Sequence, residues 1–180
     1  MKSNNLPELD IVKASNDFDF LKKIAVENNF FKYLNKYALP TLNLSKLKNF
    51  IISCIEEKEF KTNLTSRPYH IIVDPTNACN LGCPLCPTGA GQSQRIKGIL
   101  KFDVFKKIID EVEDYCIELH LYNWGEPTLN KNLVQMLNYA KSKNIWTRIS
   151  SNLSLKYKEN YLEQLLKSGL SLLHVDIDGI

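Results

Sequence analysis

The sequence predicts an α/β fold in which short parallel strands alternate with helices, preceded by a helical segment. Residues 1–66 carry apolar side chains at helical spacing and no run typical of a strand. From residue 69 onward, four short β-type runs alternate with three amphipathic segments. Such alternation favours parallel strands joined by right-handed crossover helices, so we expect one sheet with helices packed against it.

The composition is that of an ordinary globular protein and argues against several functional classes. The chain has 180 residues, of which 44% are hydrophobic and 24% charged, and its net charge is +3. This charge is too small and too evenly spread to indicate a nucleic-acid partner. The N-terminus lacks the apolar core of a signal peptide, and no apolar run is long enough to cross a bilayer. We therefore expect a cytoplasmic protein without a nucleic-acid or membrane partner.

The helical segment contains one clear amphipathic helix, for which Ser45 is the predicted N-cap. Its apolar face consists of Leu44, Leu47, Phe50, Ile51, Cys54 and Ile55. This stripe predicts a helix that is buried along one side, with Cys54 as a small apolar core residue.

After residue 68, strands and helices are predicted to follow one another in alternation. The predicted strands are Tyr69–Asp74, Ile117–Tyr122, Ile145–Ser150 and Leu172–Asp178. The predicted helices are Phe102–Tyr115 with Asp103 as its cap, Asn130–Lys143 and Lys158–Lys167. Polar residues alternate with apolar ones in the later strands. We therefore expect helices on one face of the sheet and a polar interior on the other.

The loops that follow the strands carry the polar and reactive residues of the chain. In parallel sheets of this kind, ligands bind at the carboxyl ends of the strands. The loop at residues 75–101 holds three cysteines, and the loop at 123–129 holds a Trp-Gly-Glu-Pro turn. Ser151 and Asn152 follow the third strand, and the fourth loop starts at Gly179. All four loops would lie along one edge, as a single active site requires.

The stretch CNLGCPLC places Cys79, Cys83 and Cys86 in the first of these loops. In a cytosolic chain, such a group of cysteines indicates a metal site rather than a disulfide framework. A structural zinc site needs four ligands, so a distant cysteine or histidine would have to supply the fourth. A cubane iron–sulfur cluster usually has four thiolates, and with three it keeps one iron open to a substrate or cofactor.

The C-x3-C-x2-C loop after the first strand resembles the signature loop of the radical S-adenosylmethionine (SAM) superfamily. The Trp124–Pro127 turn resembles the Gly-Gly-Glu motif of that family, with tryptophan at the first position. The segments 150–152 and 175–179 resemble the ends of its third and fourth strands. The resemblance implies a partial (β/α)6 barrel at residues 67–180 with four strands present, after a helical N-terminal extension at residues 1–66.

The resemblance also implies which residues hold the cofactors. Cys79, Cys83 and Cys86 would each bind one iron of a [4Fe-4S] cluster, and SAM would chelate the fourth iron. Gly125 and Glu126 would face the SAM amino group, because a carboxylate and an ammonium attract each other.

Three further residues would contact other parts of SAM by the same resemblance. Ser150 would lie near the SAM carboxylate or ribose. Asp176, an acid, suits a ribose hydroxyl better than a carboxylate. Leu85 stands where the family often has an aromatic residue beside the adenine, and leucine can still provide an apolar contact.

The implied reaction is reductive cleavage of SAM to methionine and a 5′-deoxyadenosyl radical, which abstracts hydrogen from a substrate. The implied partners are an electron donor of the flavodoxin or ferredoxin type and an unknown peptide or small-molecule substrate. The family core has two strands more than are predicted up to Ile180, so we interpret the chain as part of a longer enzyme. The alternative is an inactive fragment that acts only as an iron–sulfur or zinc-binding module.

Overall fold

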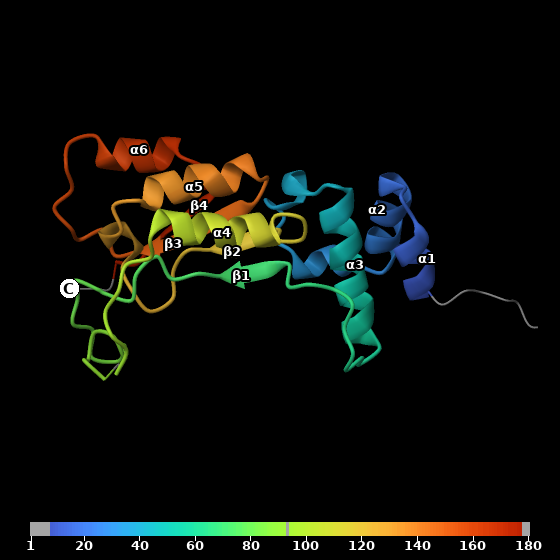
Figure 1. The fold of residues 1–180 in the computed structure, drawn as a ribbon, viewed down its shortest axis with the longest axis horizontal. Coiled ribbons are helices and arrows are strands. Elements are labelled where there is room, and N and C mark those ends of the chain that lie inside the picture. Colours follow the sequence, from blue (N-terminus) through green and yellow to red (C-terminus); the bar gives the residue numbers. More distant parts are fainter. Residues whose placement is uncertain (1–7, 93, 178–180) are drawn as a thin grey trace, which may run out of the picture. The chain divides into compact units, whose positions relative to one another are not determined.

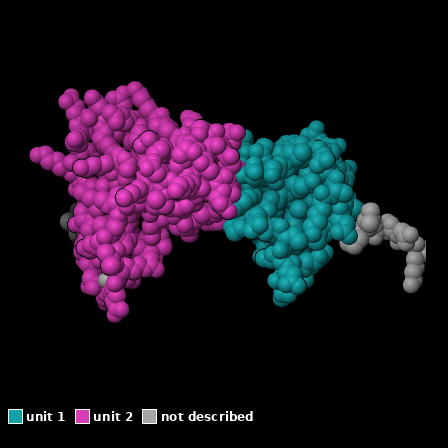
Figure 2. Space-filling view, in the orientation of Figure 1, with its two compact units in different colours: residues 1–69, 114–117 teal, residues 70–113, 118–180 magenta. Residues whose placement is uncertain are grey.

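The computed structural model describes residues 8–92 and 94–177 (Figure 1). The chain divides into two compact units (Figure 2). The first unit contains residues 1–69 and 114–117, and the second contains residues 70–113 and 118–180. The segment 114–117 belongs to the first unit although it lies inside the predicted core domain. The predicted boundary between an extension and a core domain at residue 67 stays a prediction.

The first unit is helical and is organised around one long helix. Its helices are α1 (Glu8–Ala14), α2 (Phe18–Glu27) and α3 (Leu44–Lys58), with short 3-10 helices η1 (Phe30–Tyr33) and η2 (Leu39–Thr41). Both α1 and α2 contact α3. The predicted stripe of α3 is buried from Leu47 to Ile55, and Cys54 is part of that core.

The start of α3 differs from the prediction. Asn43, not Ser45, is the N-cap, and its side chain accepts a hydrogen bond of 2.9 Å from the backbone N–H of Lys46. A capping side chain must reach an N–H group two or three positions ahead, and helix α3 already begins at Leu44. Asn and Ser are both good N-caps, so the sequence does not distinguish between Asn43 and Ser45, which are only two residues apart.

The second unit contains a four-stranded parallel sheet with strand order β1-β2-β3-β4. The strands are β1 (His70–Ile72), β2 (Glu118–His120), β3 (Trp146–Ser151) and β4 (Leu172–Val175). The helices are α4 (Phe102–Val112), α5 (Leu133–Ser142) and α6 (Tyr161–Lys167), with a 3-10 helix η3 (Pro127–Leu129). The predicted alternation of parallel strands and helices is therefore confirmed.

Most elements are shorter than predicted, and their ends have local causes. Helix α4 starts at Phe102 with Lys101 at the N-cap position, so the predicted cap Asp103 lies inside the helix. Helix α5 starts three residues later than predicted, because η3 and the turn after it occupy the preceding segment. Strand β4 ends at Val175, and the predicted end at Asp178 lies outside the described residues.

The sheet has one apolar and one polar face, as its alternating sequence predicted. Leu119, Leu121 and Ile149 are fully buried, and α5 contacts β3. On the other face, the rings of His120 and Tyr122 stack with centroids 5.5 Å apart. The Arg148 guanidinium lies 5.5 Å from the centre of the Tyr122 ring. This polar face leads to the carboxyl ends of the strands, where the loops with the candidate site residues begin.

Candidate active site at the carboxyl ends of the strands

The three cysteines of the CNLGCPLC stretch lie in the loop between β1 and α4 and line one cavity of about 360 Å³. Each is a half-buried free thiol. The Cys86 backbone N–H donates to the Cys83 carbonyl at 3.2 Å, and the Ala90 N–H donates to the Cys86 carbonyl at 2.8 Å. These turns bring three thiols that are separated in sequence to the wall of one cavity.

Gly89 fixes the path of the loop behind the cysteines. A Cβ atom at this position would lie 2.6 Å from the Cys83 backbone nitrogen and 2.8 Å from the Cys83 carbonyl oxygen. Both distances are too short for any side chain, so only glycine fits here. Sequence reasoning missed this residue; the signal available was the Thr-Gly pair two residues after the third cysteine.

Gly125 plays a similar part in the second loop. A Cβ atom on Gly125 would lie only 1.9 Å from the carbonyl oxygen of Thr76. The next residue, Glu126, donates its backbone N–H to the Ala78 carbonyl at 2.8 Å. The Trp-Gly-Glu-Pro turn therefore lies directly against the backbone that precedes Cys79, and it couples the second loop to the cysteine loop.

Glu126 is 2% exposed, and its carboxylate lines the cavity. Its Oε1 accepts hydrogen bonds from the backbone N–H and the hydroxyl of Thr128 and, at 2.7 Å, from the hydroxyl of Ser151. Its Oε2 accepts the backbone N–H of Asn152 at 3.0 Å. A carboxylate has about four acceptor positions. Oε2 thus has capacity for a donor from the cavity, while Oε1 holds the side chain in place.

Asn152 links the third loop to the first cysteine. Its Nδ2 lies 3.9 Å from the Cys79 Sγ and donates to the Asn80 Oδ1 at 3.2 Å. Asn80 in turn donates to the hydroxyl of Ser154 at 2.8 Å. The predicted polar end of the third strand therefore contacts the cysteine loop, a connection that sequence spacing alone did not reveal.

Asn130 is a further positioning residue that sequence reasoning missed. It is 1% exposed, and its side-chain NH2 group donates to the carbonyl of Pro75 at 2.9 Å and to the carbonyl of Leu100 at 3.0 Å. These two carbonyls lie near the start and the end of the cysteine loop. One buried amide thus holds both ends of the loop together.

Ser150 and Asp176 line the cavity as neighbours. The Ser150 hydroxyl donates a hydrogen bond to Asp176 Oδ2, and the other carboxylate oxygen of Asp176 lies 3.2 Å from His174 Nε2. The Asp176 backbone N–H donates to the Ser151 carbonyl at 3.0 Å. The structure therefore brings the two predicted SAM contacts, one at the end of β3 and one just after β4, to one side of the cavity.

Leu85 is placed differently from the other predicted site residues. Its side chain is 97% exposed, and the residue does not line the cavity. Leu81, from the same loop, is the leucine in the cavity wall. A contact between Leu85 and adenine stays a prediction. Leu81 provides an apolar side chain in the cavity wall that the sequence analysis did not predict.

Histidines continue the polar face of the sheet beside the site. His70 and His120 have ring centroids 4.1 Å apart, and His120 Nε2 lies 3.8 Å from a carboxylate oxygen of Glu118. Burial lowers the pKa of His70, and the neighbouring His120 lowers it further. We therefore expect His70 to be neutral at pH 7.

The donor set of the cavity fits an iron–sulfur cluster. Among the described residues, no three His, Cys, Asp or Glu side chains are grouped to hold one metal ion. The thiolates of a cubane cluster bind different irons, so their sulfur atoms line a cavity rather than converge on a point. Three free thiols around a cavity of this size meet that requirement.

The sequence model of the radical SAM superfamily matches residues 73–180, which include all three loops described above. The chain belongs to the radical SAM superfamily. Enzymes of this superfamily use a [4Fe-4S] cluster and SAM.

Several curated radical SAM relatives are similar to this chain. A 7,8-dihydro-6-hydroxymethylpterin dimethyltransferase from Methanocaldococcus jannaschii is 25% identical in an alignment of 177 positions that covers 96% of this chain and 31% of that protein. An Fe-coproporphyrin III synthase from Methanosarcina barkeri is 31% identical over 61% of this chain and 27% of that protein. A PqqA peptide cyclase from Bradyrhizobium diazoefficiens is 26% identical over 63% of this chain and 29% of that protein. The chain thus spans less than a third of the length of these relatives.

Solved structures of radical SAM enzymes share the fold. The structure of BtrN in complex with AdoMet and 2-DOIA has a TM-score of 0.53 at 19% identity, over 64% of this chain and 48% of BtrN. The structure of SuiB from Streptococcus suis has a TM-score of 0.51 at 18% identity, over 91% of this chain and 38% of SuiB. These similarities confirm the fold of a partial radical SAM core. Within the described residues of this chain, no helix is both long and apolar enough to span a membrane.

Proposed function

We propose that this chain forms the part of a radical SAM enzyme that binds the [4Fe-4S] cluster and SAM. The observation that carries the proposal is the make-up of one cavity. Of the described residues, three free thiols and two carboxylates line it and no basic side chain does, and the carboxylates are those of Glu126 and Asp176. SAM carries a sulfonium and an ammonium group, so an acidic cavity beside a cluster of cysteines complements it.

The roles of the residues follow from their places in the cavity. Cys79, Cys83 and Cys86 would hold three irons of the cluster as thiolates. The free acceptor position of Glu126 Oε2 would bind the SAM ammonium, and the close approach of Gly125 to Thr76 would fix that carboxylate relative to the cysteine loop.

The other polar wall would hold the ribose. Ser150 and Asp176 hydrogen-bond to each other and can bind sugar hydroxyls from one side of the cavity. Leu81 offers an apolar wall, while the predicted contact of Leu85 with adenine would require its exposed side chain to turn toward the ligand.

The cluster, when bound, supplies one electron that cleaves SAM into methionine and a 5′-deoxyadenosyl radical, which abstracts hydrogen from a substrate. The electron would come from a carrier of the flavodoxin or ferredoxin type. The names of the relatives above refer to a pterin, an iron coproporphyrin product and a peptide, so the similarity leaves the substrate open. The five free thiols of the chain are consistent with the proposed cytoplasmic location.

The test is whether SAM alters the cluster. We expect the anaerobically reconstituted chain to contain iron and sulfide and its reduced form to give an electron paramagnetic resonance spectrum that changes when SAM is added. The Cys83→Ala variant should lose the cluster. The matched control Cys54→Ala removes a thiol from the helical unit and should keep it.

The alternative is a module that binds iron–sulfur or zinc without SAM. A bound metal whose spectrum does not respond to SAM would support this alternative and contradict our proposal. A Cys83→Ala variant that still bound the cluster and cleaved SAM would show that the ligand assignment is wrong.

A further inference from the structure

The part of the cysteine loop that follows the three cysteines has a marked charge bias. Between Asp74 and Asp103 the sequence contains no acidic residue and three basic ones, Arg95, Lys97 and Lys101. The whole chain, by contrast, has nearly balanced numbers of acidic and basic residues. The cavity that we assign to SAM uses none of these three basic residues. The proposed function therefore does not account for the basic residues of this segment.

The backbone of this segment is held in place. Thr76 and Ile99 form an antiparallel bridge, and the Thr76 hydroxyl donates to the Gly98 carbonyl at 2.7 Å. The Asn77 side chain donates to the Ile96 carbonyl at 2.9 Å and accepts the Gly98 N–H at 2.7 Å. The Ile96 side chain is nevertheless 93% exposed. A large apolar side chain is thus presented to solvent from an anchored turn.

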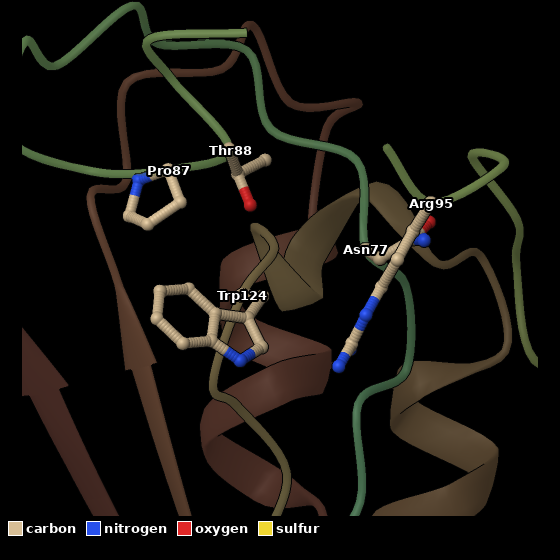
Figure 3. Close-up of a pocket in the computed structure, with 5 residues that line it drawn as sticks. All are labelled: Asn77, Pro87, Thr88, Arg95 and Trp124. Carbon is tan, nitrogen blue, oxygen red and sulfur yellow. The ribbon is translucent and has the colours of Figure 1, made fainter. Parts of the chain in front are cut away.

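A hollow of about 190 Å³ lies next to this turn and borders the cysteine loop (Figure 3). It is lined by Asn77, Pro87, Thr88, Arg95 and Trp124. Pro87 directly follows the third cysteine of the cluster motif, so the hollow lies beside the loop that would hold the cluster. In Figure 3 the Arg95 side chain runs past Asn77 toward the side of the hollow that is formed by the Trp124 indole.

Trp124 is the residue that departs from the family pattern, since a glycine is common at its position. Its indole is partly exposed, and its backbone N–H donates to the Asp74 carboxylate at 3.0 Å. An aromatic side chain and an arginine beside a hollow are typical anchors of protein–protein interfaces. Trp124 thus gives the second loop a partly exposed aromatic surface beside the cluster loop.

We propose that Trp124, Arg95, Ile96 and Lys97 form the docking surface for a small acidic protein that carries single electrons. This inference rests on the proposed function, because the carrier would reduce the cluster. One electron leaves the reduced carrier and enters the cluster, and no proton or group is transferred. Acidic side chains of the carrier would meet Lys97, and its apolar contact would cover Ile96 and the indole. Basic residues at the edge of an interface accelerate the approach of an acidic partner.

Location and charge favour this partner over others. A surface used for electron delivery must lie close to the cluster, and the hollow begins one residue after Cys86. A positive rim favours an acidic partner and disfavours a basic one. A basic partner would be an alternative occupant, and the experiment below separates the two cases.

The test is a direct binding measurement with oxidised flavodoxin as the probe, on both the metal-free and the reconstituted chain. We expect binding at low ionic strength that weakens as salt is added. The double variant Ile96→Ser/Lys97→Glu should bind at least about tenfold more weakly. The matched control Leu166→Ser/Lys167→Glu makes the same kind of change at an exposed pair on α6 and should bind like the wild type.

Three results would overturn the docking surface. The first is that the wild type does not bind flavodoxin. The second is that the wild type and the Ile96→Ser/Lys97→Glu variant bind flavodoxin with equal affinity. The third is that a basic carrier such as cytochrome c binds as tightly as flavodoxin or more tightly. The proposed function is tested separately, because dithionite reduction and the SAM-induced spectral change need no carrier. A variant that keeps the SAM response and loses flavodoxin binding supports the docking surface alone. A chain that binds flavodoxin but shows no SAM response would overturn only the function.

Discussion

Glu126 and Gly125 shape the site in two different ways. Glu126 is placed by four hydrogen bonds from Thr128, Ser151 and Asn152, and one of its oxygens still has capacity for a ligand. Gly125 has no side chain, and this leaves room for the Thr76 carbonyl to lie close to its backbone. A charged group and an absent side chain therefore both determine where a ligand can bind.

Replacing the Glu126 carboxylate with an amide should weaken SAM binding and leave the cluster in place. Glu126→Gln removes the charge that would pair with the SAM ammonium, and a charge-assisted hydrogen bond is worth about 1.5–3 kcal/mol. We expect the Kd for SAM, measured by titration calorimetry on the reconstituted chain, to rise by about tenfold or more. The control Glu111→Gln changes an exposed acid of α4 and should bind SAM normally. An unchanged Kd in Glu126→Gln would contradict the assigned role.

Adding a methyl group at Gly125 should disrupt the contact between the first two loops. In Gly125→Ala the Cβ atom would lie 1.9 Å from the Thr76 oxygen, so the backbone must move. We expect a loss of about 1–3 kcal/mol in the free energy of unfolding and a lower iron content after reconstitution. Gly98→Ala is the matched control, because a Cβ atom there meets no neighbour within 4 Å. Equal stability and iron content in the two variants would refute this close packing.

At the scale of elements, helix ends and loop anchors are set by side chains that reach the backbone. Asn43 caps α3, Glu56 near the end of α3 binds the segment that follows it, and Asn130 joins the two ends of the cysteine loop. These contacts involve polar residues that sequence patterns mark only as helix ends or loops. The structure shows which of them bears the contact.

The cap of α3 can be tested by two alanine substitutions. Asn43→Ala removes the acceptor for the Lys46 N–H and should lower the free energy of unfolding by about 1 kcal/mol. Ser45 lies inside the helix, so Ser45→Ala should change the free energy of unfolding by less than about 0.5 kcal/mol. Chemical denaturation of both variants checks this. A larger loss of unfolding free energy in Ser45→Ala than in Asn43→Ala would show that Ser45, as predicted from sequence, is the N-cap.

Glu56 should make the helical unit sensitive to acid. Burial alone would raise its pKa, but four hydrogen bonds from Ser66 and Thr65 outweigh burial and lower the pKa from 4.5 to about 2. Because the folded state has the lower pKa, the unfolded chain takes up the proton first as the pH falls. The stabilisation is therefore complete above pH 4.5 and is lost between pH 4.5 and about 2.

The measurement compares thermal unfolding of the wild type and Glu56→Gln from pH 6 to pH 3. We expect the wild type to be more stable at pH 6 and the difference between the two proteins to shrink toward pH 3. A difference that stays constant over this range would show that the Glu56 carboxylate is not the source of the acid sensitivity.

At the scale of the whole molecule, each unit has its own apolar core, and the cysteines of the site lie outside both. The sheet unit buries residues such as Phe105, Leu119, Leu137 and Ile149, and the helical unit buries Leu21, Phe50 and Ile55. The cysteine loop runs from β1 to α4 and is anchored by hydrogen bonds from Asn130. The fold therefore does not depend on the cluster for its core.

Removal of the cluster should thus leave the fold intact. We expect the chain treated with a chelator under oxidising conditions to keep its far-ultraviolet circular dichroism spectrum, because helices and strands are held by apolar contacts. The change should be confined to faster hydrogen exchange in the segment 79–92. Structural zinc domains unfold when their metal is removed, so general unfolding of this chain would identify a structural metal site instead.

From the sequence alone we could predict the alternation of strands and helices, the polar and apolar faces of the sheet, and the loop of three cysteines after the first strand. These features are local, because hydrophobic period and cysteine spacing can be read along the chain. Three other features could be seen only in the packed fold: Gly125 lies against Thr76, Asn130 joins the ends of the cysteine loop, and Leu81 rather than Leu85 lines the cavity. Each of these depends on which segments, distant along the chain, come together when the sheet and its helices pack. A sequence pattern carries no measure of those distances.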